Sequence, residues 1–273
     1  MMVERTLHFI SGLPRSGSTL LSALLRQNPR FHANMSSPVS GLITSLITGM
    51  GGSNEYSLFI SDPQRVRILR GLFEQFYGEE FTQPVLFDSN RGWCAQMPLL
   101  AQLFPASKVI ACVREVPWII DSVERLIQRN AITPSAMFNF QAGGTVYSRA
   151  DGLANAEGML GFPYNALKQA FYGEQTSQLL LVRYESLVSD PQAVLNGIYD
   201  FIDEPAFSHD LHNLTFDAQE FDLRAGTPGL HDVRPSVQAV PRPTLLPPDL
   251  FARFSNDAFW QHPQYNPHGV RVL

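Results

Sequence analysis

Short apolar runs alternate along the chain with longer stretches in which apolar residues recur every three or four positions. The runs are typical of buried strands, and the periodic stretches are typical of amphipathic helices. Strands are predicted over residues 7–10, 85–88, 108–113 and 179–182. Helices are predicted over residues 19–27, 64–77, 95–104, 117–129, 154–172 and 191–202. This alternation predicts an α/β fold of three layers, with a central parallel sheet flanked by helices and the strand 108–113 at its centre.

The C-terminal tail differs from the rest of the chain. Residues 228–273 hold eight of the 20 prolines, which excludes a normal helix or a central strand there. The same stretch carries Phe251, Phe259 and Trp260, and a disordered tail would be poorer in aromatic residues. We therefore predict one domain over residues 1–273, with the tail as a wrap or lid on it.

The composition excludes several classes of protein. With 44% hydrophobic residues the 273-residue chain can bury a core, and its net charge of −5 argues against a nucleic-acid coat protein. The longest mildly apolar stretch, 41–50, is too short and too polar to span a bilayer. The two cysteines, Cys94 and Cys112, make no disulfide framework, so a cytoplasmic protein is expected. The oligomeric state is left open, with a homodimer as one option.

A glycine-rich segment, Gly12-Leu-Pro-Arg-Ser-Gly-Ser-Thr19, joins the first predicted strand to the first predicted helix. Gly12, Gly17 and Thr19 have the spacing of a P-loop, so the predicted fold is P-loop-like. Backbone N–H groups at a helix N-terminus form a cradle for anions, and Arg15 adds a fixed positive charge. The segment therefore predicts a site for a phosphate or a similar anion.

The lysine of the P-loop is missing, because Ser18 stands in its place. Lysine is scarce altogether: 18 of the 20 basic residues are arginine, and the two lysines are Lys108 and Lys168. Arginine suits bidentate anion binding, although a coding bias would give the same count. A kinase needs the P-loop lysine on the terminal phosphates of its nucleotide, beside Mg²⁺. The sequence thus disfavours a nucleotide-dependent kinase, and it predicts no metal site.

A second anion site is predicted at the end of the central strand. Arg114 follows the strand 108–113, and Ser122 lies two helical turns further on. Parallel sheets bind ligands at the carboxyl ends of their strands, and an arginine fork and a hydroxyl can share the oxygens of one phosphate.

Three segments resemble sulfotransferases that use 3′-phosphoadenosine 5′-phosphosulfate (PAPS). Gly12–Leu21 resembles their 5′-phosphosulfate loop, in the form found in the protein-tyrosine sulfotransferase branch. Leu103–Glu115, followed by Ser122, resembles their 3′-phosphate element. Val182–Leu187 resembles their later Tyr-Glu-x-Leu segment. The resemblance covers roughly residues 6–202 and is nearest to bacterial, soluble members.

The resemblance implies a set of donor-binding residues. Those expected at the 5′-phosphosulfate are Pro14, Arg15, Ser16, Gly17, Ser18 and Thr19. Those expected at the 3′-phosphate or near the nucleotide are Arg114, Ser122 and Tyr184. Arg234 lies in the tail, beyond the segments that carry the resemblance, and is expected from its position beside His231 to reach a nucleotide phosphate.

The catalytic residues of the family are absent from their expected places. Sulfuryl transfer needs positive charge at the leaving oxygen and a base for the acceptor hydroxyl. The family glutamate would fall on Ser36, 21 residues after Arg15, and residues 85–93 lack the family lysine. An arginine must then supply the charge: Arg91 is predicted by position, and Arg15 is expected to share this role.

Two regions compete for the base. Asp88 ends a predicted strand at the ligand edge, while His231 and Asp232 belong to the tail. Asp88 is equally well interpreted as the ion-pair partner that orients Arg91. His231 can serve only if the tail folds over the cleft.

We therefore expect an enzyme that moves a sulfuryl group from PAPS to a hydroxyl and releases adenosine 3′,5′-bisphosphate. The resemblance favours a tyrosine in a peptide or protein as acceptor. The alternatives are a hydroxyl of a small molecule, sugar or lipid, and a nucleotide-binding protein without catalysis.

Overall fold

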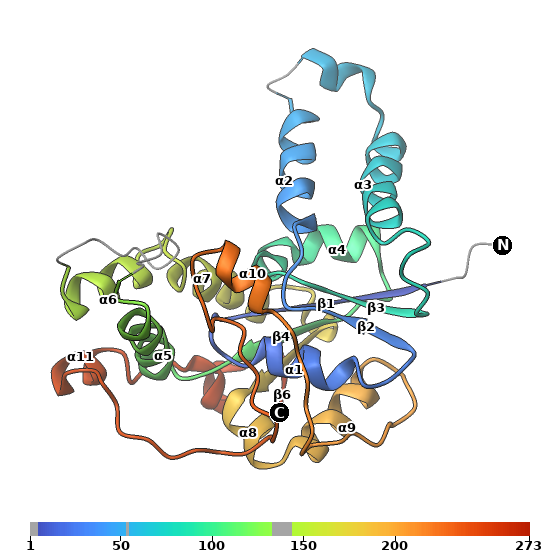
Figure 1. Cartoon of the computed structure of the whole chain (residues 1–273). Helices are drawn as coiled ribbons and strands as arrows, with labels where there is room; N and C mark the ends of the chain where they lie inside the picture. Colours follow the sequence, from blue (N-terminus) through green and yellow to red (C-terminus); the bar gives the residue numbers. More distant parts are fainter. Residues whose placement is uncertain (1–4, 53–54, 133–143) are drawn as a thin grey trace.

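A six-stranded parallel sheet forms the centre of the molecule (Figure 1). This computed structural model describes residues 5–52, 55–132 and 144–273. The strands run in the order β2-β3-β1-β4-β5-β6. Their bounds are β1 Thr6–Gly12, β2 Phe31–Ala33, β3 Val85–Ser89, β4 Val109–Val113, β5 Leu179–Arg183 and β6 Arg271–Val272. The α/β fold and the central place of 108–113 are thereby confirmed.

The four predicted strands correspond to β1, β3, β4 and β5, whereas β2 and β6 were not predicted. The two missed strands have three and two residues, which is too short for a hydrophobic pattern to identify. Each is an edge strand: Phe31 pairs with Val85, and Arg271 pairs with Leu180. The tail therefore supplies an edge strand of the sheet.

The described part of the chain contains eleven α-helices. They are α1 (Ser18–Leu25), α2 (Val39–Gly49), α3 (Asp62–Phe76), α4 (Met97–Leu103), α5 (Val116–Arg129), α6 (Val146–Ala154), α7 (Gly161–Phe171), α8 (Tyr184–Ser189), α9 (Pro191–Phe201), α10 (Gln219–Arg224) and α11 (Pro248–Arg253). The helices predicted over 19–27, 64–77, 117–129 and 191–202 match α1, α3, α5 and α9. The apolar stretch 41–50 forms α2, which packs beside α3 and stands away from the sheet (Figure 1).

The single helix predicted over 154–172 is wrong. Two helices, α6 and α7, meet in a tight turn over 155–160. A Cβ atom at Gly158 would lie 2.4 Å from the Leu153 carbonyl oxygen, and one at Gly161 would lie 1.9 Å from that of Asn155. The two glycines thus allow a close approach of backbones that ends the first helix. The helix predicted over 95–104 is also shorter, because residues Arg91–Gln96 form a 3₁₀ helix before α4.

Both faces of the sheet are buried, which explains the nearly unbroken apolar runs of its strands. Along β1, Phe9 packs into a core with α2 to α7 and Ile10 packs into a core with α1 and α9. The same alternation holds in β4, where Ala111 and Cys112 belong to opposite cores. Of the helices in the described residues, none is long and apolar enough to cross a membrane.

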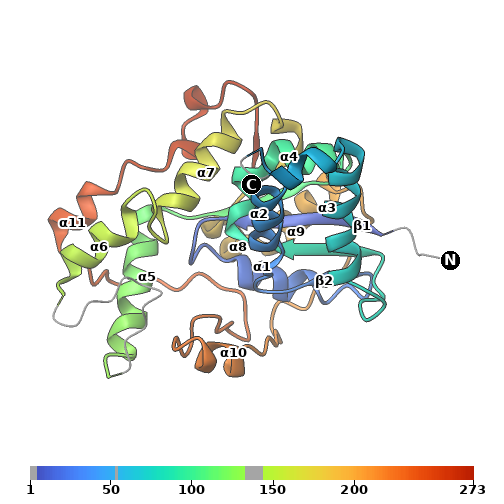
Figure 2. The ribbon, with the colours of Figure 1, turned by 90° about the horizontal axis from the view of Figure 1, so that it is seen from above.

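The tail crosses from α10 past α5 to α11 (Figures 1 and 2). Asp121 of α5 is fully buried and holds this crossing. Its carboxylate pairs with Arg242 Nη2 at 2.7 Å and accepts hydrogen bonds from the backbone N–H of Leu245 (2.7 Å) and from Arg125 Nε (3.0 Å). A buried carboxylate with these partners fixes the tail against α5.

Candidate active site

One pocket of about 1110 Å³ lies where the carboxyl ends of β1, β3, β4 and β5 meet the tail. It exceeds the usual size of a small-molecule site, so it has room for a nucleotide and a second substrate. Among the described residues that line it, eight are arginines and two, Glu185 and Asp232, carry carboxylates. The arginines are Arg15, Arg91, Arg114, Arg125, Arg129, Arg183, Arg234 and Arg242. The pocket is therefore a site for polyanionic ligands, and its cations are all arginine.

The loop between β1 and α1 presents backbone donors to this pocket. The N–H groups from Ser16 to Thr19 donate to no acceptor among the described residues. Gly12 has a φ of 104°, and a Cβ atom there would lie 2.2 Å from the Cys112 carbonyl oxygen. Gly17 has a φ of 95° and packs under the ring of Tyr184. Both glycines are needed for the path of the loop, which leaves a row of free N–H groups at the start of α1.

Ser16 does not face the pocket with its side chain. Its hydroxyl donates to the carbonyl oxygens of Leu13 and Cys112, and the residue is buried. Pro14, Gly17, Ser18 and Thr19 do line the pocket. The Ser16 hydroxyl therefore ties the loop to β4, and the expected contact of Ser16 with the donor is left to its backbone N–H.

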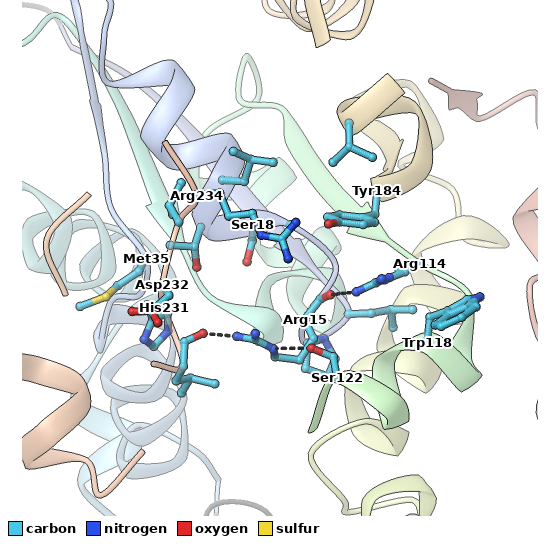
Figure 3. A pocket seen from close by; sticks show the side chains of 18 of the residues that line it. Arg15, Ser18, Met35, Arg114, Trp118, Ser122, Tyr184, His231, Asp232 and Arg234 are labelled. Atoms are coloured by element: carbon cyan, nitrogen blue, oxygen red, sulfur yellow. Dashed lines mark hydrogen bonds between the residues drawn. The ribbon is translucent and has the colours of Figure 1, made fainter. Parts of the chain in front are cut away.

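Arg114 lies at the end of β4, between the rings of Tyr184 and Trp118 (Figure 3). Its guanidinium lies over the Tyr184 ring, 4.1 Å from the centroid, and its Nη1 donates to the Arg15 carbonyl oxygen at 3.3 Å. Its buried Nε has no hydrogen-bond partner among the described residues. Burial lowers the pKa of this guanidinium, which stays charged at neutral pH. A charged, buried donor without an acceptor marks a place for an anion.

Arg15 connects three parts of the site (Figure 3). Its Nε donates to Ser122 Oγ of α5 at 3.1 Å, and its Nη1 donates to the carbonyl oxygen of Leu230 in the tail. Its φ is 55°, an uncommon conformation for a residue other than glycine. Burial and the charge of Arg114 lower the pKa of Arg15 to about 10. The Arg15 side chain thus places a positive charge in the pocket and also links the loop to α5 and to the tail.

Arg91 follows β3 and lines the pocket on its first 3₁₀ turn. Ser11 Oγ donates to the Arg91 carbonyl oxygen at 3.1 Å, and the side chain of Asn90 accepts from the N–H of Gly92 at 2.9 Å. The guanidinium makes no hydrogen bond or ion pair with any described residue, and burial lowers its pKa. The backbone of Arg91 is therefore held in place, and its cation is available to a ligand.

Asp88 is in the core and not in the pocket, which corrects its assignment as base. It is fully buried, and its carboxylate accepts hydrogen bonds from Ser37 (2.7 Å), Tyr77 (2.8 Å) and the Trp93 indole (2.8 Å). Burial raises its pKa, and these three donors act in the opposite direction. The alternative ion pair with Arg91 is likewise not formed, although both residues lie in the described part of the chain. The strand position was right, but the side chain points into the hydrophobic layer.

His231 lines the pocket from the tail, on the side of Arg15 opposite Arg114 (Figure 3). Its Nδ1 lies 2.6 Å from Asp222 Oδ1, and its backbone N–H donates to Asp222 Oδ2 at 2.8 Å. Asp232 and Arg234 line the pocket beside it and are both exposed. The tail does fold over the cleft, as a role for His231 requires.

Comparison with known proteins decides the family. A profile described as the sulfotransferase family matches residues 8–209. The chain belongs to the sulfotransferase family. Its fold is similar to that of the sulfotransferase domain from the Curacin biosynthetic pathway, with 15% identity, a TM-score of 0.57 and coverage of 92% of this chain and 96% of that one. A search of curated proteins gives no significant match.

Two further solved structures align less closely. The sulfotransferase domain from the Synechococcus PCC 7002 olefin synthase has 16% identity, a TM-score of 0.48 and coverage of 92% of this chain and 94% of that one. A sulfotransferase from Alicyclobacillus acidocaldarius has 15% identity, a TM-score of 0.46 and coverage of 81% and 90%.

Neither of the two lysines of this sulfotransferase lies in the pocket. Lys108 and Lys168 are absent from the lining, and Lys108 instead contacts the Phe201 ring at 5.0 Å. Ser36, which stands at the place of the family glutamate, does line the pocket. Within the described residues no group of three His, Cys, Asp or Glu side chains could hold a metal ion.

The sequence did not reveal Asp222, which contacts His231 behind the pocket, nor the lining residues Arg125, Arg129, Arg183 and Arg242. Asp222 lies nine positions before His231 on a short helix, in a region without a recognisable motif. No spacing rule connects an aspartate to a histidine across such a loop, so its partner is evident only after folding.

Proposed function

We propose that the enzyme transfers a sulfuryl group from PAPS to an acceptor hydroxyl and releases adenosine 3′,5′-bisphosphate. The observation that carries this proposal is Arg114, a half-buried arginine whose buried Nε is unpaired and lies beside the free N–H groups of the loop. One anion site at the loop and another at Arg114 suit a nucleotide that bears charge at both its 5′ and 3′ ends.

The residues fit PAPS as follows. The N–H groups from Ser16 to Thr19, with Arg15, would hold the 5′-phosphosulfate. Arg114 and Ser122 would hold the 3′-phosphate, with Tyr184 and Arg234 near the nucleotide. Bound PAPS supplies an activated sulfuryl group with a phosphate as leaving group.

Two arginines would supply the positive charge that the missing family lysine provides in other members. Arg91 and Arg15 would offset the negative charge that develops on the leaving phosphate oxygen. The guanidinium of Arg15 is held by its hydrogen bond to Ser122, whereas for Arg91 only the backbone is held, through its carbonyl oxygen. A preorganised cation needs little rearrangement during transfer, which is what such a role requires.

His231 is the proposed proton acceptor for the hydroxyl. It lies in the pocket, and its Nδ1 is engaged by Asp222, so its other ring nitrogen is left for a substrate. Asp88 is withdrawn from this role because its carboxylate is saturated in the core. A histidine base is well matched to proton transfer near neutral pH.

The acceptor is proposed in two classes. A peptide tyrosine comes first, because the loop resembles the protein-tyrosine sulfotransferase branch. A small-molecule, sugar or lipid hydroxyl comes second, and similarity to a domain from the Curacin biosynthetic pathway favours the small molecule.

Transfer of radiolabel from ³⁵S-PAPS tests the proposal directly. The acceptors are a tyrosine peptide library and a panel of small alcohols, sugars and lipids. The Arg114→Ala variant is assayed in parallel as the negative control. We expect label on one acceptor class with the wild type and a strong loss with the variant. Tight binding of adenosine 3′,5′-bisphosphate without any PAPS-dependent labelling would contradict catalysis.

A further inference from the structure

Asp222 holds His231 with both of its carboxylate oxygens. Oδ1 lies 2.6 Å from His231 Nδ1, and Oδ2 accepts the His231 backbone N–H at 2.8 Å. Asp222 is 2% exposed, so these contacts are shielded from water. A carboxylate at neutral pH only accepts hydrogen bonds, which means that the proton between the two side chains belongs to Nδ1. The neutral ring must then carry its lone pair on Nε2.

We propose that Asp222 is a positioning residue that makes His231 a proton acceptor, an inference that rests on the proposed function. In the transfer, the acceptor oxygen bonds to sulfur, the bond between sulfur and the phosphate oxygen breaks, and the hydroxyl proton passes to His231 Nε2. Asp222 stays ionised and stabilises the imidazolium that forms. Solvent later takes the proton from Nε2.

A second set of contacts fixes the backbone on which His231 sits. The Leu230 carbonyl oxygen accepts from Arg15 Nη1, and the Leu230 N–H donates to Thr227 at 3.0 Å. Thr227 in turn donates its N–H to the Asp222 carbonyl oxygen at 2.8 Å. The base is thus tied to α10 on one side and to the donor-binding loop on the other. The base and the loop arginine therefore keep one relative position.

The contrasting interpretation is that Asp222 only closes the loop between itself and His231. The two roles differ in what Asp222→Asn does. An asparagine can satisfy both partners in one orientation, with its oxygen on the His231 N–H and its NH₂ on Nδ1. That orientation requires a lone pair on Nδ1 and therefore moves the ring proton to Nε2. In Asp222→Asn the loop between residues 222 and 231 would keep its hydrogen bonds, but Nε2 of His231 would carry a proton and could no longer accept one.

The experiment reads the tautomer of His231 by ¹⁵N NMR of the full chain labelled at histidine, with the pH raised until the ring signals of His231 no longer shift. His231→Gln assigns its signals, and Glu220→Gln, an exposed carboxylate on the same helix, is the matched control. We expect the Nδ1–H tautomer in the wild type and in the control, and the Nε2–H tautomer in Asp222→Asn. A wild-type His231 ring protonated on Nε2 would overturn the proposal. The wild-type spectrum alone decides this, so the test holds even if the Asp222 variant does not fold.

The rate of ³⁵S transfer is the second measurement. Asp222→Asn should lower the rate of ³⁵S transfer about a thousandfold with little change in affinity for adenosine 3′,5′-bisphosphate. In the His231→Gln background it should cause no further loss, because Asp222 acts through His231. A full additional loss there would overturn the proposal in favour of loop closure. Wild-type protein with the expected tautomer and no transfer from PAPS would instead refute the proposed function and leave the pair intact.

Discussion

The two ends of the pocket differ in how the chain builds them. The donor end consists of the loop Gly12–Thr19 together with Arg114, Ser122 and Tyr184, and each part directly follows a strand or lies on the next helix. The base end consists of Arg91, His231 and Asp222; His231 comes from the tail, and Asp222 lies on α10 just before it. The donor end is set by local chain geometry, whereas the base end depends on where the tail returns. Arg15 joins them through Ser122 and Leu230.

The largest expected effect is that of Arg15→Ala, which removes the residue shared by both ends. Its charge, its bond to Ser122 and its bond to Leu230 are lost together, so the rate of sulfuryl transfer should fall about a thousandfold. Arg224→Ala, an exposed arginine outside the pocket, is the matched control and should keep the wild-type rate. Activity of the Arg15 variant above a tenth of wild type would refute a shared role.

Asp88→Asn separates a core residue from a catalytic one. The asparagine NH₂ would face hydroxyl or indole donors in a buried site, which should lower the free energy of unfolding by about 3 kcal/mol. Urea denaturation measures this loss, and the folded variant should bind adenosine 3′,5′-bisphosphate as the wild type does. Unchanged stability with complete loss of transfer would return Asp88 to the role of base.

Arg114→Ala tests the donor end alone. It should weaken the binding of adenosine 3′,5′-bisphosphate about 30-fold and leave that of adenosine 5′-monophosphate nearly unchanged, because a charge-assisted bond to the 3′-phosphate is lost. Calorimetric titration of both nucleotides gives the comparison. An equal loss for the two would mean that Arg114 does not distinguish the 3′-phosphate.

The last effect concerns His8, which lies on β1 outside the pocket and affects stability alone. Burial and the charge of Lys108 lower its pKa from 6.5 to about 4. As the pH falls below 6.5 the unfolded chain takes up this proton and the folded chain does not, so stability present above pH 6.5 is lost toward pH 4. Between about pH 7.5 and pH 5 the wild type should lose about 2 kcal/mol more than His8→Gln. Urea denaturation measures both proteins. If wild type and His8→Gln lost the same free energy of unfolding over this pH range, His8 would not be the source of the pH dependence.

The sequence predicted most of the sheet and the donor end for one physical reason. Strand β4 is a continuous apolar run, so the position of Arg114 at its carboxyl end follows from the pattern alone. The orientation of a single side chain does not follow in this way: Asp88 ends a strand as predicted, yet it turns into the core toward Tyr77 and Trp93. Asp222 could not be found at all, because its partner is fixed by the fold of the tail.

Calorimetric titration with adenosine 3′,5′-bisphosphate, adenosine 5′-monophosphate and ATP–Mg²⁺ tests the central claim most directly. A pocket with separate anion sites at the loop and at Arg114, and with no lysine, should bind adenosine 3′,5′-bisphosphate about 30-fold more tightly than either other nucleotide. Tight binding of ATP–Mg²⁺ together with weak binding of adenosine 3′,5′-bisphosphate would contradict the account.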